Sequence, residues 1–344
     1  MPTVNVPPKQ FTACGDCDAE NLLARVLLEM KDSLSGTGLC VLLGGSYGRG
    51  DGGVRLDKEN GILYNDLDFF VFARNKSDGA EAVLKAVSHK YEQELKVDVD
   101  FSRIMSINDI KNNAKRLMMQ ELKRGYYLVC GEDLLAEYLP ELPSDRLPYS
   151  EACRLLLNRG MGLLLAGEKI SGKSGETDFI LRNLYKAILS AGDAMLITNG
   201  LYRWKLDERL ALMEQMENLT DEWKAYYREA VNFKRSPNRG QKPDMEQFWN
   251  GVRDFFQFAM RYCAGAEQPV DMPCGIYKKC SGERSLKNYI KYCIKTRALP
   301  LTDWKMYIVP PVAGILPDLY AALDQIPAEL NKQGKLYRHW LIFN

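Results

Sequence analysis

The residues of this chain whose type and spacing best suit chemistry are two aspartates, Asp66 and Asp68, at the start of an apolar segment, 66–73. If this segment is a strand, side chains alternate between its two faces, so both carboxylates point to the same side. Carboxylate oxygens are ligands for Mg²⁺ or Mn²⁺, which complete their coordination with the phosphates of a bound nucleotide. The pair therefore predicts a site for a metal ion and a nucleoside triphosphate (NTP).

A second pair with the same spacing, Asp98 and Asp100, lies in the next apolar segment, 96–104. These two aspartates also share one face if the segment is a strand. One further carboxylate on a neighbouring strand completes a two-metal site. The spacing alone leaves both aspartates as candidate metal ligands.

A glycine-rich segment, 44–50, precedes the aspartates and reads Gly-Gly-Ser-Tyr-Gly-Arg-Gly. Its glycines allow backbone N–H groups to approach phosphate oxygens in conformations that other residues rarely adopt. Gly45 and Ser46 are therefore predicted phosphate ligands, Ser46 through its hydroxyl. Arg49 is a further candidate for the triphosphate, and a surface or capping role is the alternative.

The order of these motifs, Gly-Ser, then Asp-x-Asp, then a carboxylate on a later strand, resembles the pattern of the DNA polymerase β-like nucleotidyltransferases. More narrowly, the segments 45–49 and 96–101 are similar to the corresponding segments of the aminoglycoside (kanamycin-type) nucleotidyltransferases. The resemblance extends roughly over residues 20–105 and does not reach the remainder of the chain.

The resemblance implies that Asp66, Asp68 and Asp98 are the catalytic and metal-binding carboxylates. It favours Asp98 over Asp100 as the third ligand. One segment departs from the minimal members of the superfamily, because the connection 51–64 is longer than their linkers. This connection is polar with glycines near both ends, which predicts a loop or a short hairpin over the site.

Hydrophobic periodicity predicts an α+β fold. The expected elements of the first part are helices over 18–34 and 79–94 and strands over 39–43, 66–73, 96–104 and 126–129. After about residue 107 helical patterns dominate. We expect a polymerase β-like nucleotidyltransferase domain with a mixed sheet and helices, 1–140, followed by a mainly helical C-terminal domain, 149–344. The proline-containing stretch 139–148 is the predicted linker.

Two basic residues of the helical part, Arg182 and Lys186, lie one turn apart on the same face of a predicted helix, 179–198. The resemblance makes them candidate phosphate ligands, because polymerase β-like enzymes often bind the nucleotide between two domains. Asp193 is a third charged residue of this otherwise apolar helix, and the alternative is a solvated helix face with a buried ion pair.

Residues 167–174 match the Walker pattern Gly-x-x-x-x-Gly-Lys-Ser. That motif requires a buried strand directly before it, whereas 151–166 has the pattern of a helix. We therefore interpret the match as chance.

Composition narrows the class of protein. The chain has 46 basic and 45 acidic residues in 344, a formal charge of +1, which gives none of the global field of a nucleic-acid coat protein. The basic stretch 277–297 is interpreted as a solvated helix face, with polynucleotide binding as the alternative.

No run of apolar residues is long enough to span a bilayer, and 1–10 contains no apolar signal core. An odd number of cysteines, nine, fits reduced thiols. We expect a cytoplasmic protein with no membrane partner.

The predicted activity is transfer of a nucleoside monophosphate from an NTP to an acceptor hydroxyl, with release of pyrophosphate and with Mg²⁺ or Mn²⁺ as cofactor. The acceptor stays open: a small molecule, a protein side chain, a second nucleotide or an RNA end. The alternative is a protein with the nucleotidyltransferase fold that binds or regulates without turnover.

Overall fold

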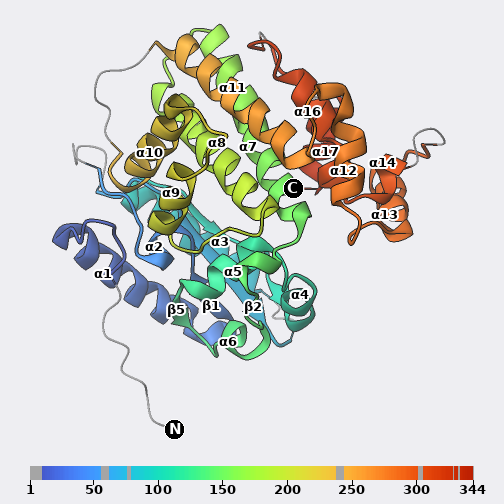
Figure 1. Cartoon of the computed structure of the whole chain (residues 1–344). Helices are drawn as coiled ribbons and strands as arrows, with labels where there is room; N and C mark the ends of the chain where they lie inside the picture. Colours follow the sequence, from blue (N-terminus) through green and yellow to red (C-terminus); the bar gives the residue numbers. More distant parts are fainter. Residues whose placement is uncertain are drawn as a thin grey trace. The chain divides into compact units, whose positions relative to one another are not determined.

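A five-stranded mixed sheet organises the first of two units in the computed structural model (Figure 1). The first unit consists of Met1–Leu142 and Asn232–Arg239, and the second of Pro143–Val231 and Gly240–Asn344. The end of one helix of the helical part, α10 (Asp221–Arg235), thus belongs to the first unit. The structure describes residues 10–55, 62–75, 79–237, 244–300, 305–327, 329–331 and 334–343.

The strand order is β3-β2-β1-β5, and β4 pairs with β2 beyond the end of β3. β1 runs antiparallel to β2 and β5, whereas β2 runs parallel to β3 and β4. The strands are β1 (Cys40–Leu43), β2 (Leu67–Ala73), β3 (Val99–Phe101), β4 (Met105–Ser106) and β5 (Tyr127–Cys130). The expected α+β class with a mixed sheet is confirmed.

The strand predicted over 96–104 is wrong in extent, because within this range only β3, Val99–Phe101, forms, and β4 begins after its end at Met105. Ser102 causes the interruption. Its N–H donates to the carbonyl of Phe69 at 2.8 Å, but its side-chain hydroxyl accepts the N–H of Val71 at 3.0 Å in place of a backbone carbonyl. A side chain that competes for a ladder hydrogen bond ends the regular pairing.

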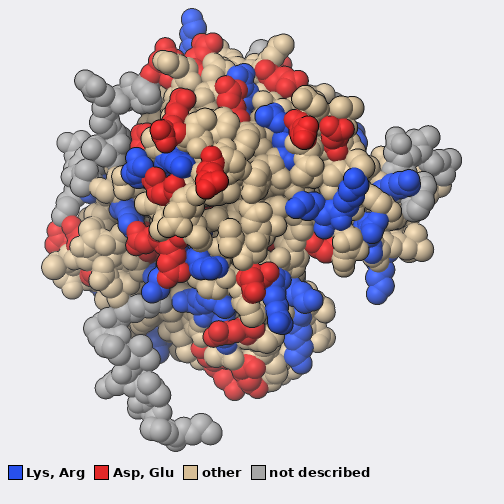
Figure 2. All heavy atoms as spheres, viewed as in Figure 1, with Lys and Arg blue, Asp and Glu red and all other residues tan. Residues whose placement is uncertain are grey.

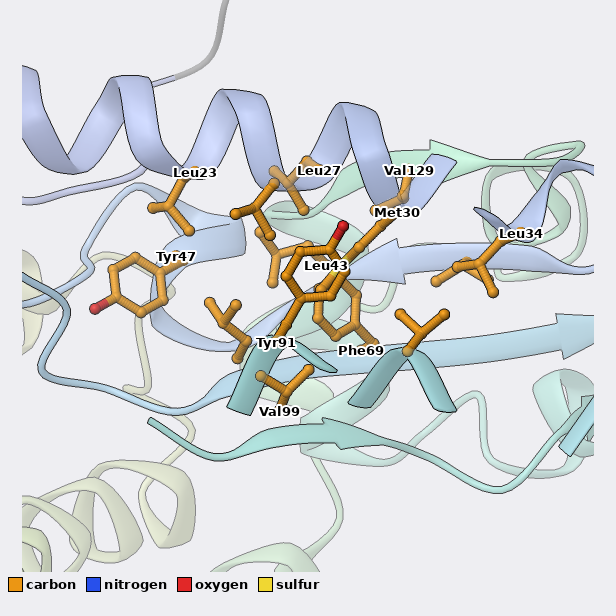
Figure 3. Close-up of a cluster of buried hydrophobic side chains, with 14 of the residues drawn as sticks. Leu23, Leu27, Met30, Leu34, Leu43, Tyr47, Phe69, Tyr91, Val99 and Val129 are labelled. Carbon is orange, nitrogen blue, oxygen red and sulfur yellow. The ribbon is translucent and has the colours of Figure 1, made fainter. Parts of the chain in front are cut away.

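Two helices, α1 (Cys17–Leu34) and α3 (Ala80–Leu95), pack on one face of the sheet. The Asp16 side chain begins α1 by accepting the N–H of Ala19 at 3.0 Å, which is a typical N-cap. Figure 3 shows the core between these helices and the strands, with Leu23, Leu27, Met30, Leu43, Phe69, Tyr91 and Val99 buried together.

A second core lies on the other face of the sheet. It joins Leu42 and Phe72 of the strands to residues such as Met119 and Leu122. The helices of this layer are α4 (Ile107–Asn112), α5 (Leu117–Arg124) and α6 (Leu134–Tyr138). Helices therefore cover both faces of the sheet, and any exposed site on it must lie where this cover ends.

All the regular secondary structure described in the second unit is helical. Its three long helices are α7 (Tyr149–Ser171), α8 (Thr177–Thr198) and α11 (Met245–Ala264). The shorter ones include α9 (Leu206–Glu214), α12 (Met272–Lys279), α13 (Leu286–Thr296), α14 (Lys305–Ile308), α15 (Pro311–Gly314), α16 (Leu316–Ala322) and α17 (Lys335–Phe343). No helix in the described ranges combines the length and the apolar character needed to cross a bilayer.

The Walker pattern begins inside a helix. Gly167 belongs to α7, and a Cβ at this position would lie 3.0 Å from the indole nitrogen of Trp249. The glycine therefore permits close helix packing and does not follow a strand, as we predicted.

His339 of α17 is buried at 5% exposure, and its Nε2 lies 2.9 Å from the carbonyl of Pro311. Because a carbonyl accepts, this nitrogen carries the proton. Burial lowers the pKa of His339 to about 4. The ring borders a pocket of about 200 Å³ that also includes Tyr292, Asp318 and Lys335.

This pKa predicts how stability depends on pH. The unfolded chain binds the proton near pH 6.5 and the folded chain only near pH 4, so the free energy of unfolding falls as the pH drops through this window, by about 3 kcal/mol from this one group. His339→Gln retains an N–H donor but takes up no proton. We expect the free energy of unfolding of this variant, measured by urea denaturation, to decrease less between pH 7 and pH 4 than that of the wild type. His89→Gln, at the exposed histidine, is the control that keeps the wild-type slope. Equal slopes for both variants would contradict the prediction.

Candidate functional site

The register between β2 and β3 brings the two aspartate pairs together. Asp68 lies directly opposite Asp100, and Leu67 lies opposite Val99. Leu67 and Val99 are buried in the core, whereas Asp68 and Asp100 are exposed. Because side chains alternate and neighbouring strands are about 4.8 Å apart, both carboxylates lie on the same face at adjacent positions.

Asp66 and Asp98 extend this arrangement by one step toward the start of both strands. The N–H of Leu67 donates to the carbonyl of Asp98 at 2.9 Å, which keeps the two chains paired there. Asp66 is half-buried and Asp98 is exposed. The structure therefore places all four predicted aspartates on one face of the sheet, and it leaves both Asp98 and Asp100 beside the first pair.

The pKa of Asp100 agrees with the close spacing of the aspartates on this face of the sheet. The pKa of Asp100 is raised, first by partial burial and then by the negative charges of Asp98, Asp66 and Glu92. Like charges at short distance disfavour ionisation, so a bound cation would relieve the repulsion.

Among the described residues, no three carboxylate, imidazole or thiol groups are close enough to form a metal site by themselves. The donors at the face of Asp66 and Asp68 are nevertheless all carboxylate oxygens. Mg²⁺ is commonly held by one or two carboxylates together with substrate phosphates, and seldom by an all-protein cage. The residues thus fit a cation that is shared with a nucleotide.

The glycine-serine segment directly contacts the aspartates. It forms the short helix α2 (Gly45–Arg49), and the N–H of Gly44 donates to the carbonyl of Asp68 at 2.8 Å. Gly45 has a φ of +60°, and a Cβ there would lie 2.2 Å from Oδ2 of Asp68. Ser46 follows and is half-buried. Only glycine at position 45 leaves room for the Asp68 carboxylate in this position.

Arg49 lies between two acidic side chains of the same unit. Its guanidinium nitrogens are 3.9 Å from a carboxylate oxygen of Asp51 and 3.8 Å from one of Glu121. A Cβ at Gly125 would lie 2.5 Å from the Arg49 side chain, so α5 and α2 are closely packed here. These contacts agree with a local structural role, and binding of the triphosphate by Arg49 stays a prediction.

Arg182 and Lys186 are half-buried residues of α8, in the second unit. Asp193 of the same helix forms a buried ion pair with Arg209, with Nε and Oδ1 3.1 Å apart, and accepts a hydrogen bond from the hydroxyl of Tyr227 at 2.8 Å. Asp193 therefore takes part in an ion pair with Arg209 of α9. Phosphate binding by Arg182 and Lys186 stays a prediction.

The long connection between the glycine segment and Asp66 is a hairpin in its described part. Val54 pairs antiparallel with Leu63, and the N–H of Arg55 donates to the carbonyl of Ile62 at 2.8 Å. Residues 56–61 of the predicted connection lie outside the described residues.

Two residues at the base of this hairpin, Tyr47 and Asn65, were missed by the sequence reasoning. Tyr47 is fully buried, and its hydroxyl contacts both arms of the hairpin. The signal in the sequence is a single large aromatic residue inside an otherwise small and polar glycine run, next to the predicted phosphate ligands.

Comparison with known proteins adds no relative: no protein-family model, no curated protein and no solved structure matches this chain. The interpretation of the site depends on the sequence pattern and on the geometry above.

The contact between Gly45 and Asp68 is testable by adding one methyl group. Gly45→Ala must place a Cβ against Oδ2 of Asp68 and adopt a positive φ. We expect a loss of about 1–3 kcal/mol in the free energy of unfolding. Gly38→Ala is the matched control, because Gly38 also has a positive φ, +68°, and nothing lies within 4 Å of a Cβ there. Chemical denaturation of both variants measures the difference, and equal stabilities would show that Asp68 does not occupy this position.

Proposed function

We propose that the first unit is a metal-dependent nucleotidyltransferase domain of the polymerase β-like type, which transfers a nucleoside monophosphate from an NTP to an acceptor hydroxyl and releases pyrophosphate. The observation that carries the proposal is the direct contact between Gly45 and Asp68. Two motifs that are separated in sequence, one suited to phosphates and one to a cation, adjoin in the fold.

Each residue has a role in this proposal. Asp66 and Asp68 hold Mg²⁺ or Mn²⁺ together with the triphosphate, and Asp98, or Asp100 in its place, provides the third carboxylate. A metal ion held there would neutralise phosphate charge and would lower the pKa of the acceptor hydroxyl. Gly45 and Ser46 orient the β- and γ-phosphates. The acceptor oxygen then forms its bond to the α-phosphorus as the bond to pyrophosphate breaks, and correct positioning supplies most of the rate enhancement.

The cellular setting is part of the proposal. All nine cysteines are free thiols, which supports a reducing compartment and a cytoplasmic location. Figure 2 shows Lys and Arg mixed with Asp and Glu over the face in view, as expected for a nearly neutral chain. A mixed surface supports a small or protein acceptor as well as an RNA end, and the acceptor is left to experiment.

The first test is turnover. The purified protein is incubated with each α-phosphate-labelled NTP and Mg²⁺ or Mn²⁺, with and without cell extract, and pyrophosphate release and label transfer are followed. We expect Asp66→Asn and Asp68→Asn each to reduce turnover at least about 100-fold, since each removes a charged metal ligand. Asp32→Asn, at an exposed aspartate of α1, is the control and keeps wild-type turnover.

Absence of turnover by the wild type under every condition would favour the alternative, a protein with this fold that binds or regulates. Nucleotide binding without pyrophosphate release would identify that case.

The third carboxylate is assigned by a second pair of variants. The family resemblance predicts that Asp98→Asn abolishes turnover while Asp100→Asn keeps about a hundredth to a tenth of it, by analogy with residues that contact metal-bound groups only indirectly. Steady-state rates at saturating metal measure both. The reverse order would assign the role to Asp100, the direct strand neighbour of Asp68.

A further inference from the structure

The hydroxyl of Tyr47 is saturated with hydrogen bonds at the base of the hairpin. It donates to the carbonyl of Gly53 at 2.7 Å and accepts the N–H groups of Tyr64 at 3.1 Å and Asn65 at 3.2 Å. A phenol has one donor and two acceptor positions, so its full capacity is used. One buried oxygen thus holds both arms of the connection that leads from α2 into β2.

Asn65 adds a second attachment between the same two arms. Its side-chain oxygen accepts the N–H of Gly53 at 2.7 Å. Asn65 immediately precedes Asp66, so its backbone and its side chain are both fixed one residue before the first proposed metal ligand. The position of Asp66 therefore depends on contacts that converge on Tyr47 and Gly53.

The other side of Tyr47 is continuous with the proposed phosphate ligands. Tyr47 directly follows Ser46 in α2, and Gly45 abuts the carboxylate of Asp68. The ring of Tyr47 lies below α1 near Leu23 in the core (Figure 3). Tyr47, which is buried in the core, thus connects Ser46, its neighbour in sequence, to the backbone that directly precedes Asp66.

The backbone at Gly52 passes close to the ring of Tyr47. A Cβ at Gly52 would lie 2.0 Å from the ring of Tyr47, so only glycine allows the backbone to pass there. Phenylalanine at position 47 would fill the same space but would remove the partner of the Asn65 N–H, whereas the Tyr64 N–H and the Gly53 carbonyl would keep the 3.2 Å hydrogen bond that they form with each other. A buried polar group that loses its partner costs about 1–3 kcal/mol, and here that group is the backbone one residue before Asp66.

We propose that Tyr47 is a positioning residue, which fixes Asp66 relative to Gly45 and Ser46 so that the metal and the phosphates bind at a set separation. This inference rests on the proposed function. It predicts that loss of the hydroxyl weakens binding of the metal in the presence of a nucleotide, beyond any effect on folding.

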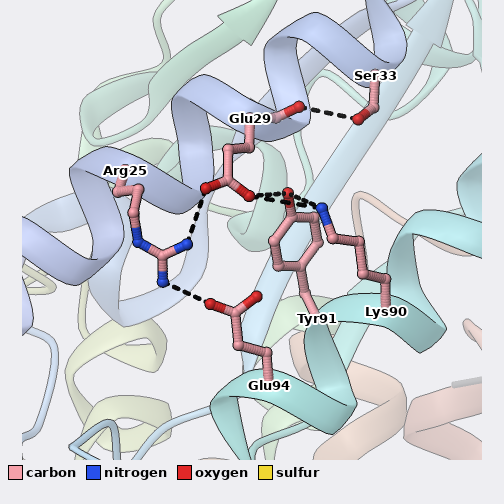
Figure 4. A network of polar contacts seen from close by, with 6 residues as sticks. All are labelled: Arg25, Glu29, Ser33, Lys90, Tyr91 and Glu94. Carbon is pink, nitrogen blue, oxygen red and sulfur yellow. Dashed lines mark hydrogen bonds and ion pairs between the residues drawn. The ribbon is translucent and has the colours of Figure 1, made fainter.

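The experiment compares Tyr47→Phe with a matched variant, Tyr91→Phe. Tyr91 is also fully buried in the first unit, and its hydroxyl donates to Glu29 at 3.0 Å within a network that includes Arg25, Lys90 and Glu94 (Figure 4). That network joins α1 to α3, apart from the hairpin base. Both variants lose one hydrogen-bonded tyrosine hydroxyl, but only Tyr47→Phe loses it next to the proposed metal and phosphate ligands.

Mn²⁺ binding is measured by electron paramagnetic resonance with the α,β-methylene analogues of the four common NTPs, and turnover is measured against metal concentration. We expect Tyr47→Phe to raise the Mn²⁺ concentration at half-saturation about tenfold or more, as for other residues that orient metal ligands. The KM for the NTP at saturating metal should change by no more than about twofold, since the phosphate ligands remain. Tyr91→Phe should follow the wild-type metal curve.

If Tyr47→Phe does not fold, Asn65→Ala provides the test, because it removes the side-chain acceptor of the Gly53 N–H and should shift the metal curve in the same direction. A folded Tyr47→Phe or Asn65→Ala with the metal curve of Tyr91→Phe would overturn the inference and leave the proposed function intact. A wild type that binds no Mn²⁺ with any analogue and shows no turnover would overturn both.

Discussion

Leu67, Phe69 and Val99 are buried on one face of the sheet, and their burial holds β2 and β3 in the register that sets Asp68 beside Asp100. Side chains alternate along a strand, so a slip of one residue would exchange the faces. It would move carboxylates into the core below α1 and α3 and apolar side chains into solvent. Both changes are strongly unfavourable, so the packing of the apolar residues fixes the position of the charged ones.

The glycine segment is attached to this register at two points. The N–H of Gly44 bonds the backbone of Asp68, and the Tyr47 hydroxyl bonds the backbone on both arms of the hairpin. Between these attachments the chain must leave α2, turn and return to β2, which the close approach of Gly52 to the Tyr47 ring makes possible. The hairpin between α2 and β2 is thus tied to a residue of the glycine segment itself.

The parts of the fold that follow from local pattern were predictable, and those that depend on tertiary contacts were not. Helix 18–34 and strand 66–73 were expected from periodicity and are present as α1 and β2. The expected strand 96–104 is interrupted because the Ser102 hydroxyl bonds β2, which no periodicity reveals. Residues 232–239 belong to the first unit, where the ring of Phe233 contacts that of Tyr64 at 6.1 Å, although they follow a helical run in sequence.

The candidate site shows the same division. The spacing of each aspartate pair predicted a shared face within its own strand, but only the register shows that the pairs adjoin. The contact of Gly45 with Asp68 and the hydrogen bonds of Tyr47 could not be predicted, because the residues that form them are separated in sequence. The choice between Asp98 and Asp100 stays open in the structure too, since parallel pairing places both on the face of Asp66 and Asp68.

The charge on this face connects the binding of the metal to that of the nucleotide. Partial burial, and after it the nearby charges of Asp98 and Asp66, raise the pKa of Asp100. Like charges thus lie close together on this face, and its carboxylates do not form a complete metal site in the described residues. A cation that arrives with a triphosphate supplies the missing ligands and the opposite charge together. A regulatory protein would use this half of the site in the same way. A transferase differs from such a regulatory protein in one respect: its third carboxylate orients an acceptor hydroxyl toward the α-phosphorus. This step depends on one aspartate and on the surface that binds the acceptor.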